Sequence, residues 1–150
     1  MRDPRSRAGA VVLLAAALVA ACAPAGPPAI ATGTDCVSCG MPIGDLRFAC
    51  ARRDVAARRK AWRVYDSIEC LARDWQRSAT PRDVYAADYD QARLHRGDSL
   101  WVVHGSFPSP MGGGLAAFLD PAAAKAVADQ TRGVVMTLDS LLATSGEPRP

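Results

Sequence analysis

Short segments in which apolar residues alternate with small or polar ones recur along the chain. This alternation is typical of strands with one face buried. The segments with this pattern are residues 46–51, 61–65 and 83–89 in the first half, and residues 99–104, 115–118 and 134–138 in the second half. We therefore expect two groups of three short strands.

A helical period replaces the alternation between the second and third strand of the first half. Ile68, Leu71 and Trp75 are spaced as one face of a helix. Asp66, followed three residues later by Glu69, matches a capping box and predicts that this helix begins there. The bulk of the small core is expected from four aromatic residues: Trp62, Tyr65, Trp75 and Tyr85.

The second half has a helix at the corresponding place. Asp120 is a good N-cap, Pro121 takes the favoured first helical position, and Gly133 is placed to end the helix. Both halves therefore have the order strand, strand, helix, strand. We predict an α+β fold of two small tandem ββαβ units, each a short antiparallel sheet with one helix, and interpret them as an internal duplication that sets Met41 against Met111.

The N-terminus has the pattern of an export signal. A basic start precedes the apolar run of residues 8–21, which is too short to span a bilayer but suits a secretory signal. Val19-Ala20-Ala21-Cys22 resembles the lipobox of bacterial lipoproteins, in which the cysteine is acylated, although an ordinary signal peptide with a nearby cysteine is the alternative. The expected segments are a signal peptide (1–21), a Pro-rich lipidated tether (22–34), two ββαβ units (35–91 and 92–143) and a flexible tail (144–150).

Charge argues against a nucleic-acid partner. The 150-residue chain has a formal net charge of +3, and the N-terminal signal supplies +2 of it. The basic residues between 52 and 60 form one short run, which is typical of a solvated hairpin tip. A hydrolase is not supported either, because the sequence lacks a nucleophile elbow. The chain is not expected to be an enzyme.

The strongest chemical motif is Asp35–Ile43, which holds two thiols and a thioether. Cys36 and Cys39 are separated by two residues and can direct both sulfurs at one ion, and Gly40 allows the sharp turn that brings in Met41. Soft sulfur ligands select Cu(I), Zn(II) or an iron-sulfur cluster. Methionine is a poor zinc ligand, so its presence favours Cu(I).

A second methionine occupies a corresponding loop, residues 105–114. Met111 precedes three glycines that lack the lysine and hydroxyl residue of a phosphate-binding loop. It is either a ligand or a filler beneath the turn. His104 follows a predicted strand and is a further candidate ligand.

Two other uses of the thiols stay open. With Cys22 acylated, four cysteines remain, and a Cys50 to Cys70 disulfide would leave Cys36 and Cys39 free. All four could instead form a structural zinc site. A thiol-disulfide redox protein would also use Cys36 and Cys39, but no amphipathic helix begins after them to lower the thiol pKa.

Three motifs behind the lipobox resemble those of the NosL family, the accessory lipoproteins of nitrous oxide reductase in denitrification. They are Cys-Val-Ser-Cys-Gly-Met41, Val-Tyr-Asp-Ser-Ile-Glu-Cys-Leu71 and Pro-Met-Gly-Gly-Gly-Leu-Ala-Ala-Phe118. The likeness covers residues 18–138, although residues 62–73 match the family motif less closely than the other segments do.

This resemblance implies a Cu(I) metallochaperone anchored at Cys22 on the periplasmic side of a bacterial membrane. It also implies two partners, the reductase that receives the copper and an associated membrane transporter. Carried over by motif, the metal ligands would be Cys39 and Met111, completed by Met41, Cys36 and His104.

Overall fold

The computed structural model describes residues 26–54, 61–75 and 83–145. Its strands are β1 (Cys50–Asp54), β2 (Ala61–Tyr65), β3 (Val84–Asp88), β4 (Arg93–Arg96), β5 (Trp101–His104), β6 (Leu115–Phe118) and β7 (Val134–Thr137). Its helices are α2 (Ile68–Arg73), α3 (Pro121–Thr131) and α4 (Leu138–Ser145), with the 3-10 turns η3 (Leu46–Phe48) and η5 (Gly97–Ser99). The predicted signal, the predicted acylation site Cys22 and the last five residues of the predicted tail lie outside these ranges. Residues 55–60 of the predicted hairpin tip lie outside them too, whereas Arg52 and Arg53 belong to β1, and Arg52 is buried rather than solvated. None of the described helices has the length and apolar character needed to cross a membrane.

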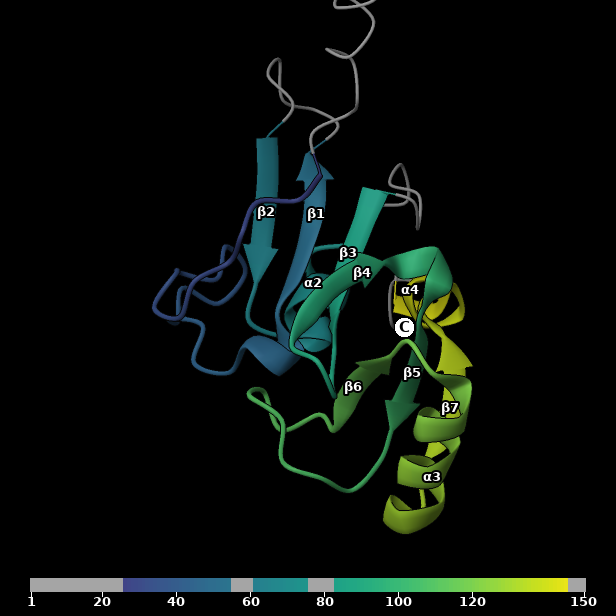
Figure 1. The fold of residues 1–150 in the computed structure, drawn as a ribbon. Helices are drawn as coiled ribbons and strands as arrows, with labels where there is room; N and C mark the ends of the chain where they lie inside the picture. The colour runs from purple at the N-terminus through teal and green to yellow at the C-terminus, as the bar shows by residue number, and fades with distance from the viewer. Residues whose placement is uncertain (1–25, 55–60, 76–82, 146–150) are drawn as a thin grey trace, which may run out of the picture.

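The two halves of the sheet have the same topology (Figure 1). In the first half β1 lies between β2 and β3, and in the second half β5 lies between β6 and β7, with antiparallel pairing throughout. The halves meet where β3 pairs in parallel with β6, at Asp88 and Ala117. The α+β class is confirmed. The expected pair of separate antiparallel sheets is instead one mixed sheet of seven strands, because pairing β3 with β6 removes an exposed edge from each unit.

Two cores lie on opposite faces of this sheet. On β5, Val102 belongs to one core and Val103 to the other, as the alternation of side chains along a strand requires. The first, called the thiol-side core here, comprises Cys36, Cys50, Tyr65, Ile68, Cys70, Leu71, Val84, Ala86, Leu100, Val102, Leu115, Ala117, Leu138 and Leu142. The second, the α3-side core, comprises Phe48, Val103, Ala116, Phe118, Ala124 and Ala128.

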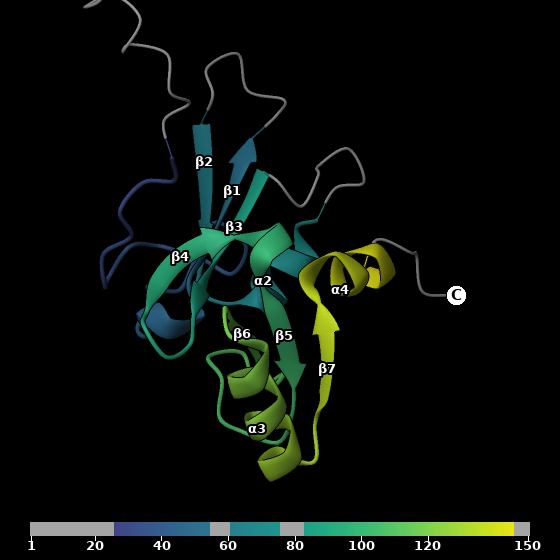
Figure 2. The ribbon, with the colours of Figure 1, turned by 45° about the vertical axis from the view of Figure 1, so that its right-hand side comes forward.

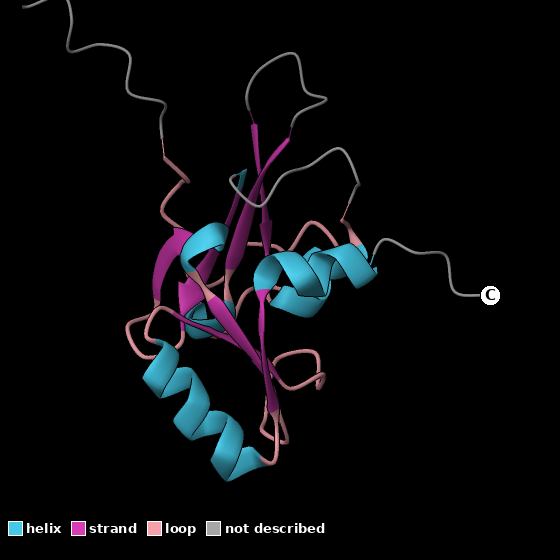
Figure 3. Cartoon of the chain, turned by 90° about the vertical axis from the view of Figure 1, so that its right-hand side faces the viewer, coloured by secondary structure: helices cyan, strands magenta, loops and turns pink. Residues whose placement is uncertain are grey.

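The helices follow this division. α2 and α4 pack against each other on the thiol side, whereas α3 covers the second-half strands from the other side (Figures 2 and 3). The strands of the second half run between α3 and α4 in Figure 3. Because both faces are covered, apolar runs such as that of β6, buried throughout, are favourable.

The first predicted helix is shorter than expected and is capped differently. Ser67, rather than Asp66, is the N-cap, and its hydroxyl accepts a 3.3 Å hydrogen bond from the Cys70 amide. Glu69 therefore takes no part in a capping box, and its carboxylate is available elsewhere. The cap predicted for α3 is confirmed: the Asp120 carboxylate accepts from the Ala122 amide at 2.8 Å. That helix ends through Arg132, in the left-handed conformation (φ 53°), just before Gly133.

Other described elements also differ from the sequence prediction. Residues 46–48 form η3 rather than a strand, since the Asp45 carboxylate accepts from the Arg47 amide at 3.0 Å and starts a turn. β4 and α4 were not predicted. Among the four aromatic residues expected in the core, only Tyr65 is fully buried. Trp62 and Tyr85 instead make an edge-to-face contact with ring centroids 5.5 Å apart, partly exposed on the sheet.

Candidate metal centre

A small hairpin over residues 33–43 presents the Cys-x-x-Cys-Gly-Met motif. The Cys36 amide donates to the Met41 carbonyl at 2.9 Å, and the Gly40 amide donates to the Cys36 carbonyl at 2.8 Å. Gly40 has φ +74°, a conformation that only glycine adopts without strain. The turn predicted at this glycine is present, and it folds Cys36 and Cys39 onto one side of the loop.

This hairpin is tied to the first-half sheet. The Val37 amide donates to the carbonyl of Val64 in β2 at 3.0 Å. Cys36 is 1% exposed and belongs to the thiol-side core. The buried thiol therefore points inward, toward α2.

Cys70, from α2, completes a cluster of three thiols. The sulfurs of Cys36, Cys39 and Cys70 all lie within 4.8 Å of one another. Three sulfurs that surround an ion at about 2.3 Å in a plane are roughly 4.0 Å apart, so the cluster is close to the geometry of a three-coordinate site. Cys36 and Cys70 are buried and Cys39 is partly exposed, which leaves one side of the cluster open to solvent.

The three thiols are electrostatically unequal. Burial raises the pKa of Cys36, but backbone amides of Asp66, Cys39 and Ser38 donate to its sulfur and bring its pKa below the ordinary value. Burial, together with hydrogen bonds and charge from the other two cysteines, raises the pKa of Cys70 to about 12. Cys36 therefore loses its proton more readily than Cys70, and a metal would displace the protons that remain.

The loop that carries Met111 is fastened to α2 next to Cys70. The Ser109 hydroxyl donates to Glu69 Oε1 at 3.0 Å, and Ser109 Oγ accepts from the Gly114 amide at 2.9 Å. The amide of Leu115 also donates to Glu69 Oε1, at 3.4 Å. One carboxylate from the thiol-bearing helix therefore holds both ends of the loop.

Two glycines allow this close packing. A Cβ on Gly113 would lie 2.7 Å from Cγ and Oε1 of Glu69. Gly114 has φ +66°, and a Cβ there would collide with the Gly105 carbonyl oxygen. The glycine run therefore does more than expose Met111: it lets the loop lie directly on Glu69 and on the end of β5.

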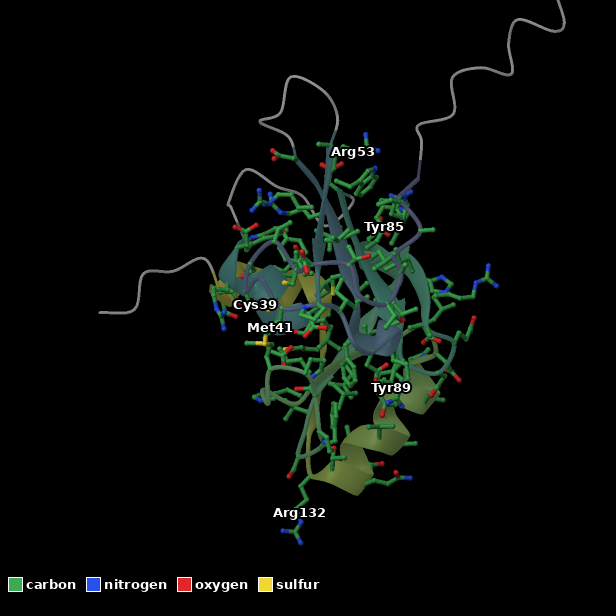
Figure 4. The ribbon with its side chains drawn as sticks, turned by 90° about the vertical axis from the view of Figure 1, so that its left-hand side faces the viewer. Cys39, Met41, Arg53, Tyr85, Tyr89 and Arg132 are labelled. Carbon is green, nitrogen blue, oxygen red and sulfur yellow. The ribbon has the colours of Figure 1, made fainter. Side chains whose placement is uncertain are left out.

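Both predicted thioethers lie on this side of the molecule. Met41 is 44% exposed, and in Figure 4 it projects from the surface next to Cys39. Met111 is partly buried and packs against the thiol-side core, to which Cys36 and Cys70 belong. The first loop thus places Met41 beside Cys39, and the second places Met111 against the core to which Cys36 and Cys70 belong.

The other candidate residues are not brought into the cluster. The His104 side chain is exposed at the end of β5 and does not join the three thiols within the described part of the chain. Cys50 is fully buried, its sulfur donates to the Phe48 carbonyl at 3.4 Å, and burial raises the pKa of its thiol well above the ordinary value. Cys22, the predicted acylation site, lies outside the described residues.

The suggested disulfide between Cys50 and Cys70 is absent, because the described cysteines are all free and Cys70 lies with the hairpin thiols. The predicted copper ligands did not include Cys70, which was considered as a metal ligand only for the alternative zinc site. Glu69 was also missed. The available signal was the short segment from Asp66 to Leu71, directly after a strand, where a helical turn directs Cys70 and Leu71 into the core.

Comparisons with known proteins agree with this arrangement. No curated protein sequence matches the chain significantly. A solved structure, that of the copper chaperone NosL from Shewanella denitrificans, superimposes with a TM-score of 0.66 at 19% sequence identity, covering 78% of this chain and 96% of that one. The sequence model of the NosL family matches residues 27–145. The chain therefore belongs to the NosL family.

Proposed function

We propose that this protein is a Cu(I) carrier rather than an enzyme, and that it binds its cargo at Cys36, Cys39 and Cys70. The observation that carries the proposal is the meeting of three thiol sulfurs within 4.8 Å at the surface end of the thiol-side core. Thiolates select soft metal ions. The copper chaperone with which the chain shares its fold supports the choice of copper.

The donor set suits Cu(I) better than a structural zinc ion. Structural zinc is almost always held by four protein ligands in a closed tetrahedral site. Cys50 does not supply the fourth thiol, because its sulfur donates to the Phe48 carbonyl. Met41 is exposed next to Cys39 and Met111 packs against the thiol-side core, and a thioether is a good partner for Cu(I) and a poor one for zinc. A set of thiolates and thioethers therefore favours the monovalent, softer ion.

The exposure of the ligands suggests how copper leaves. Cys36 and Cys70 hold the ion from the buried side, whereas Cys39 and Met41 face solvent. An incoming thiolate or thioether of an acceptor takes the place of the exposed ligands first, and the buried thiolates release the ion last. Each exchange forms one metal-sulfur bond as another breaks, with no change in oxidation state.

The setting of this transfer follows from the family resemblance. We propose that Cys22 is acylated and holds the protein on the periplasmic side of a bacterial membrane. The recipient would be nitrous oxide reductase, whose copper centres need Cu(I) for assembly, and a membrane transporter of the same system would be the second partner.

The direct test is anaerobic titration of the reduced, full-length protein in detergent with Cu(I) and, separately, with Zn(II). Wild type is compared with Cys39→Ser and with Met111→Leu, which keeps the volume and removes only the sulfur. The proposal predicts one tightly bound Cu(I), weakened by both substitutions and hardly displaced by zinc. Zinc bound by thiolates with Met111→Leu silent would support a structural site instead, and binding of neither metal would return Cys36 and Cys39 to redox chemistry.

A further inference from the structure

A groove separates the two loops that carry Met41 and Met111. One wall is Pro42–Phe48, the other is Pro108–Pro110, and Asp66 forms part of its lining. Its volume of about 380 Å³ is at the low end of sites that hold small ligands, about 300–1,000 Å³. We call it the Asp66 groove.

Asp66 is the feature of this groove that lacks an explanation within the fold. It is only 3% exposed, and its carboxylate accepts a hydrogen bond from the Gly44 amide. Its buried oxygen Oδ1 has no hydrogen-bond partner among the residues that the structure describes. Buried carboxylates are normally paired, so an oxygen of this kind at the wall of a groove indicates a missing donor.

The surroundings provide no cation for it. Arg47, the basic residue of the groove, makes a 2.7 Å ion pair with Asp45 and lies over the Tyr89 ring, 4.7 Å from its centroid. Within residues 26–54, 61–75 and 83–145, no ion pair reaches Asp66. Glu69, whose Oε2 is also buried and has no partner in the described part of the chain, adds negative charge near it.

The walls favour an organic cation over a divalent metal ion. Calcium requires six to eight oxygen ligands, and magnesium requires a near-octahedral set with several waters. This groove offers only one carboxylate that is free of an ion pair, because Asp45 is already paired with Arg47. Three prolines and Phe48 provide the apolar part of its lining. Apolar walls above a buried carboxylate suit an arginine or lysine side chain, whose stem packs against apolar surface while its head donates hydrogen bonds.

The position of the groove identifies the protein that would supply this side chain. Its two walls continue directly into the loops of Met41 and Met111, so a partner that reaches the exposed copper ligands also covers the groove. We propose that the Asp66 groove receives an arginine or lysine of the protein that exchanges copper with this chain, and that this contact aligns the two sets of metal ligands. The inference rests on the proposed copper-carrier function and deepens it by stating the chemistry of the partner.

Binding is tested with ¹⁵N-labelled, metal-free, reduced full-length protein in detergent. The probes are the tripeptides Ac-Gly-Arg-Gly-NH₂ and Ac-Gly-Gln-Gly-NH₂. We expect the arginine peptide to shift the Gly44 and Asp66 amide signals saturably and the glutamine peptide to leave them unchanged. In Asp66→Asn the arginine-dependent shift should be lost, while in Asp98→Asn, which removes an exposed acid elsewhere, it should persist.

Transfer is tested with Cu(I)-loaded protein and an excess of Ac-Cys-Gly-Met-Gly-Arg-NH₂ or its glutamine counterpart, with copper measured in each fraction after timed separation. The arginine peptide should remove copper at least about threefold faster at low salt, because charge complementarity acts mainly on the association rate. The ratio should fall to about one in Asp66→Asn and remain high in Asp98→Asn.

Equal shifts and equal rates for the two peptides with wild-type protein would overturn the inference, and this comparison does not depend on the folding of any variant. A persistent arginine effect in Asp66→Asn would overturn the assignment to this groove. Failure of the copper-carrier proposal is recognised separately, because the protein would then bind no Cu(I) while the tripeptide titration would still report on the groove.

Discussion

Glu69 and Ser109 are 40 positions apart in the sequence and are joined by a 3.0 Å hydrogen bond from the Ser109 hydroxyl to the Glu69 carboxylate. Glu69 directly precedes Cys70, and Ser109 stands two residues before Met111. The bond therefore connects the helix that supplies a buried thiol with the loop that supplies a thioether. It fixes the relation between the two halves of the chain at the candidate metal centre.

Replacing Glu69 with alanine should weaken Cu(I) binding by about tenfold, a typical effect of losing a group that orients a metal ligand. The loop loses its anchor, and Met111 is no longer held against the thiol-side core. If Glu69 acts through Met111, the double substitution Glu69→Ala with Met111→Leu should cost little more than either one alone. Competition with a Cu(I) chelator measures all three affinities, and fully additive losses would show that Glu69 acts by another route.

Cys70 and Cys50 should respond oppositely in the same assay. Cys70→Ser removes one of three converging sulfurs, and the loss of Cu(I) affinity should exceed the roughly 10–100-fold cost of losing an outer-shell partner. Cys50→Ala should leave the affinity within about threefold, since its sulfur faces the Phe48 carbonyl. An unchanged affinity in Cys70→Ser, with the protein folded, would remove this thiol from the site.

The sequence predicted features of the fold that depend on neighbouring residues, but not those that depend on distant ones. Local patterns predicted most of the strands and helices along the chain, the Asp120 cap and the turn at Gly40, because each depends on neighbouring residues. The repeated succession of strand, strand, helix and strand was also visible, and the topologies of β1–β3 and β5–β7 correspond. The pairing of β3 with β6, which merges the two units, depends on contacts between residues about 30 positions apart, and no local period encodes it.

The same distinction between local and long-range features applies to the residues of the candidate site. Cys36 and Cys39 could be paired from their spacing alone. Cys70 could not be assigned, because a thiol on a short helix is equally compatible with a disulfide, a buried side chain or a ligand. Glu69 was misassigned to a capping box, since its spacing from Asp66 fits that motif, whereas tertiary packing turns its carboxylate to the second loop.

The glycines of the Met111 loop should differ in their tolerance of alanine. Gly112 and Gly114 both have positive φ, at 70° and 66°. Backbone strain from alanine at either position should therefore lower the free energy of unfolding by about 1–2 kcal/mol. At Gly112 the added methyl meets open space, whereas at Gly114 it collides with the Gly105 carbonyl. Urea unfolding should therefore show Gly114→Ala to be less stable than Gly112→Ala by at least about 1 kcal/mol. Equal unfolding free energies for the two variants would mean that the loop can move away from β5 without loss of stability.

The last prediction concerns Asp74, which ends α2 and binds three side chains of the first-half sheet. It accepts hydrogen bonds from Tyr65 Oη at 2.7 Å, Arg63 Nε at 2.9 Å and Arg52 Nη2 at 3.2 Å. The Arg52 side chain is only 2% exposed, so Asp74→Asn leaves a buried guanidinium without its counter-charge. Because Asp74 itself is 26% exposed, we expect a loss of about 2–3 kcal/mol, less than the 3–5 kcal/mol of a fully buried pair.

This loss should depend on pH in a defined direction. Burial alone would raise the pKa of Asp74, but the hydrogen bonds from Tyr65, Arg63 and Arg52 and the charge of Arg63 outweigh it and bring the pKa below the ordinary value. The folded protein then binds fewer protons than the unfolded chain, so the contribution of Asp74 is complete above about pH 5 and disappears as the pH falls from about 4 through the lowered pKa. Urea unfolding of wild type and Asp74→Asn between about pH 7 and pH 3 should show the difference between their unfolding free energies shrinking at the acidic end.

The opposite effect of Asp66, whose pKa is raised by burial, is common to both proteins and cancels in this difference. Asp98→Asn, in an exposed pair with Arg96, should cost less than about 0.5 kcal/mol throughout, and a difference between wild type and Asp74→Asn that grew toward low pH would contradict the account.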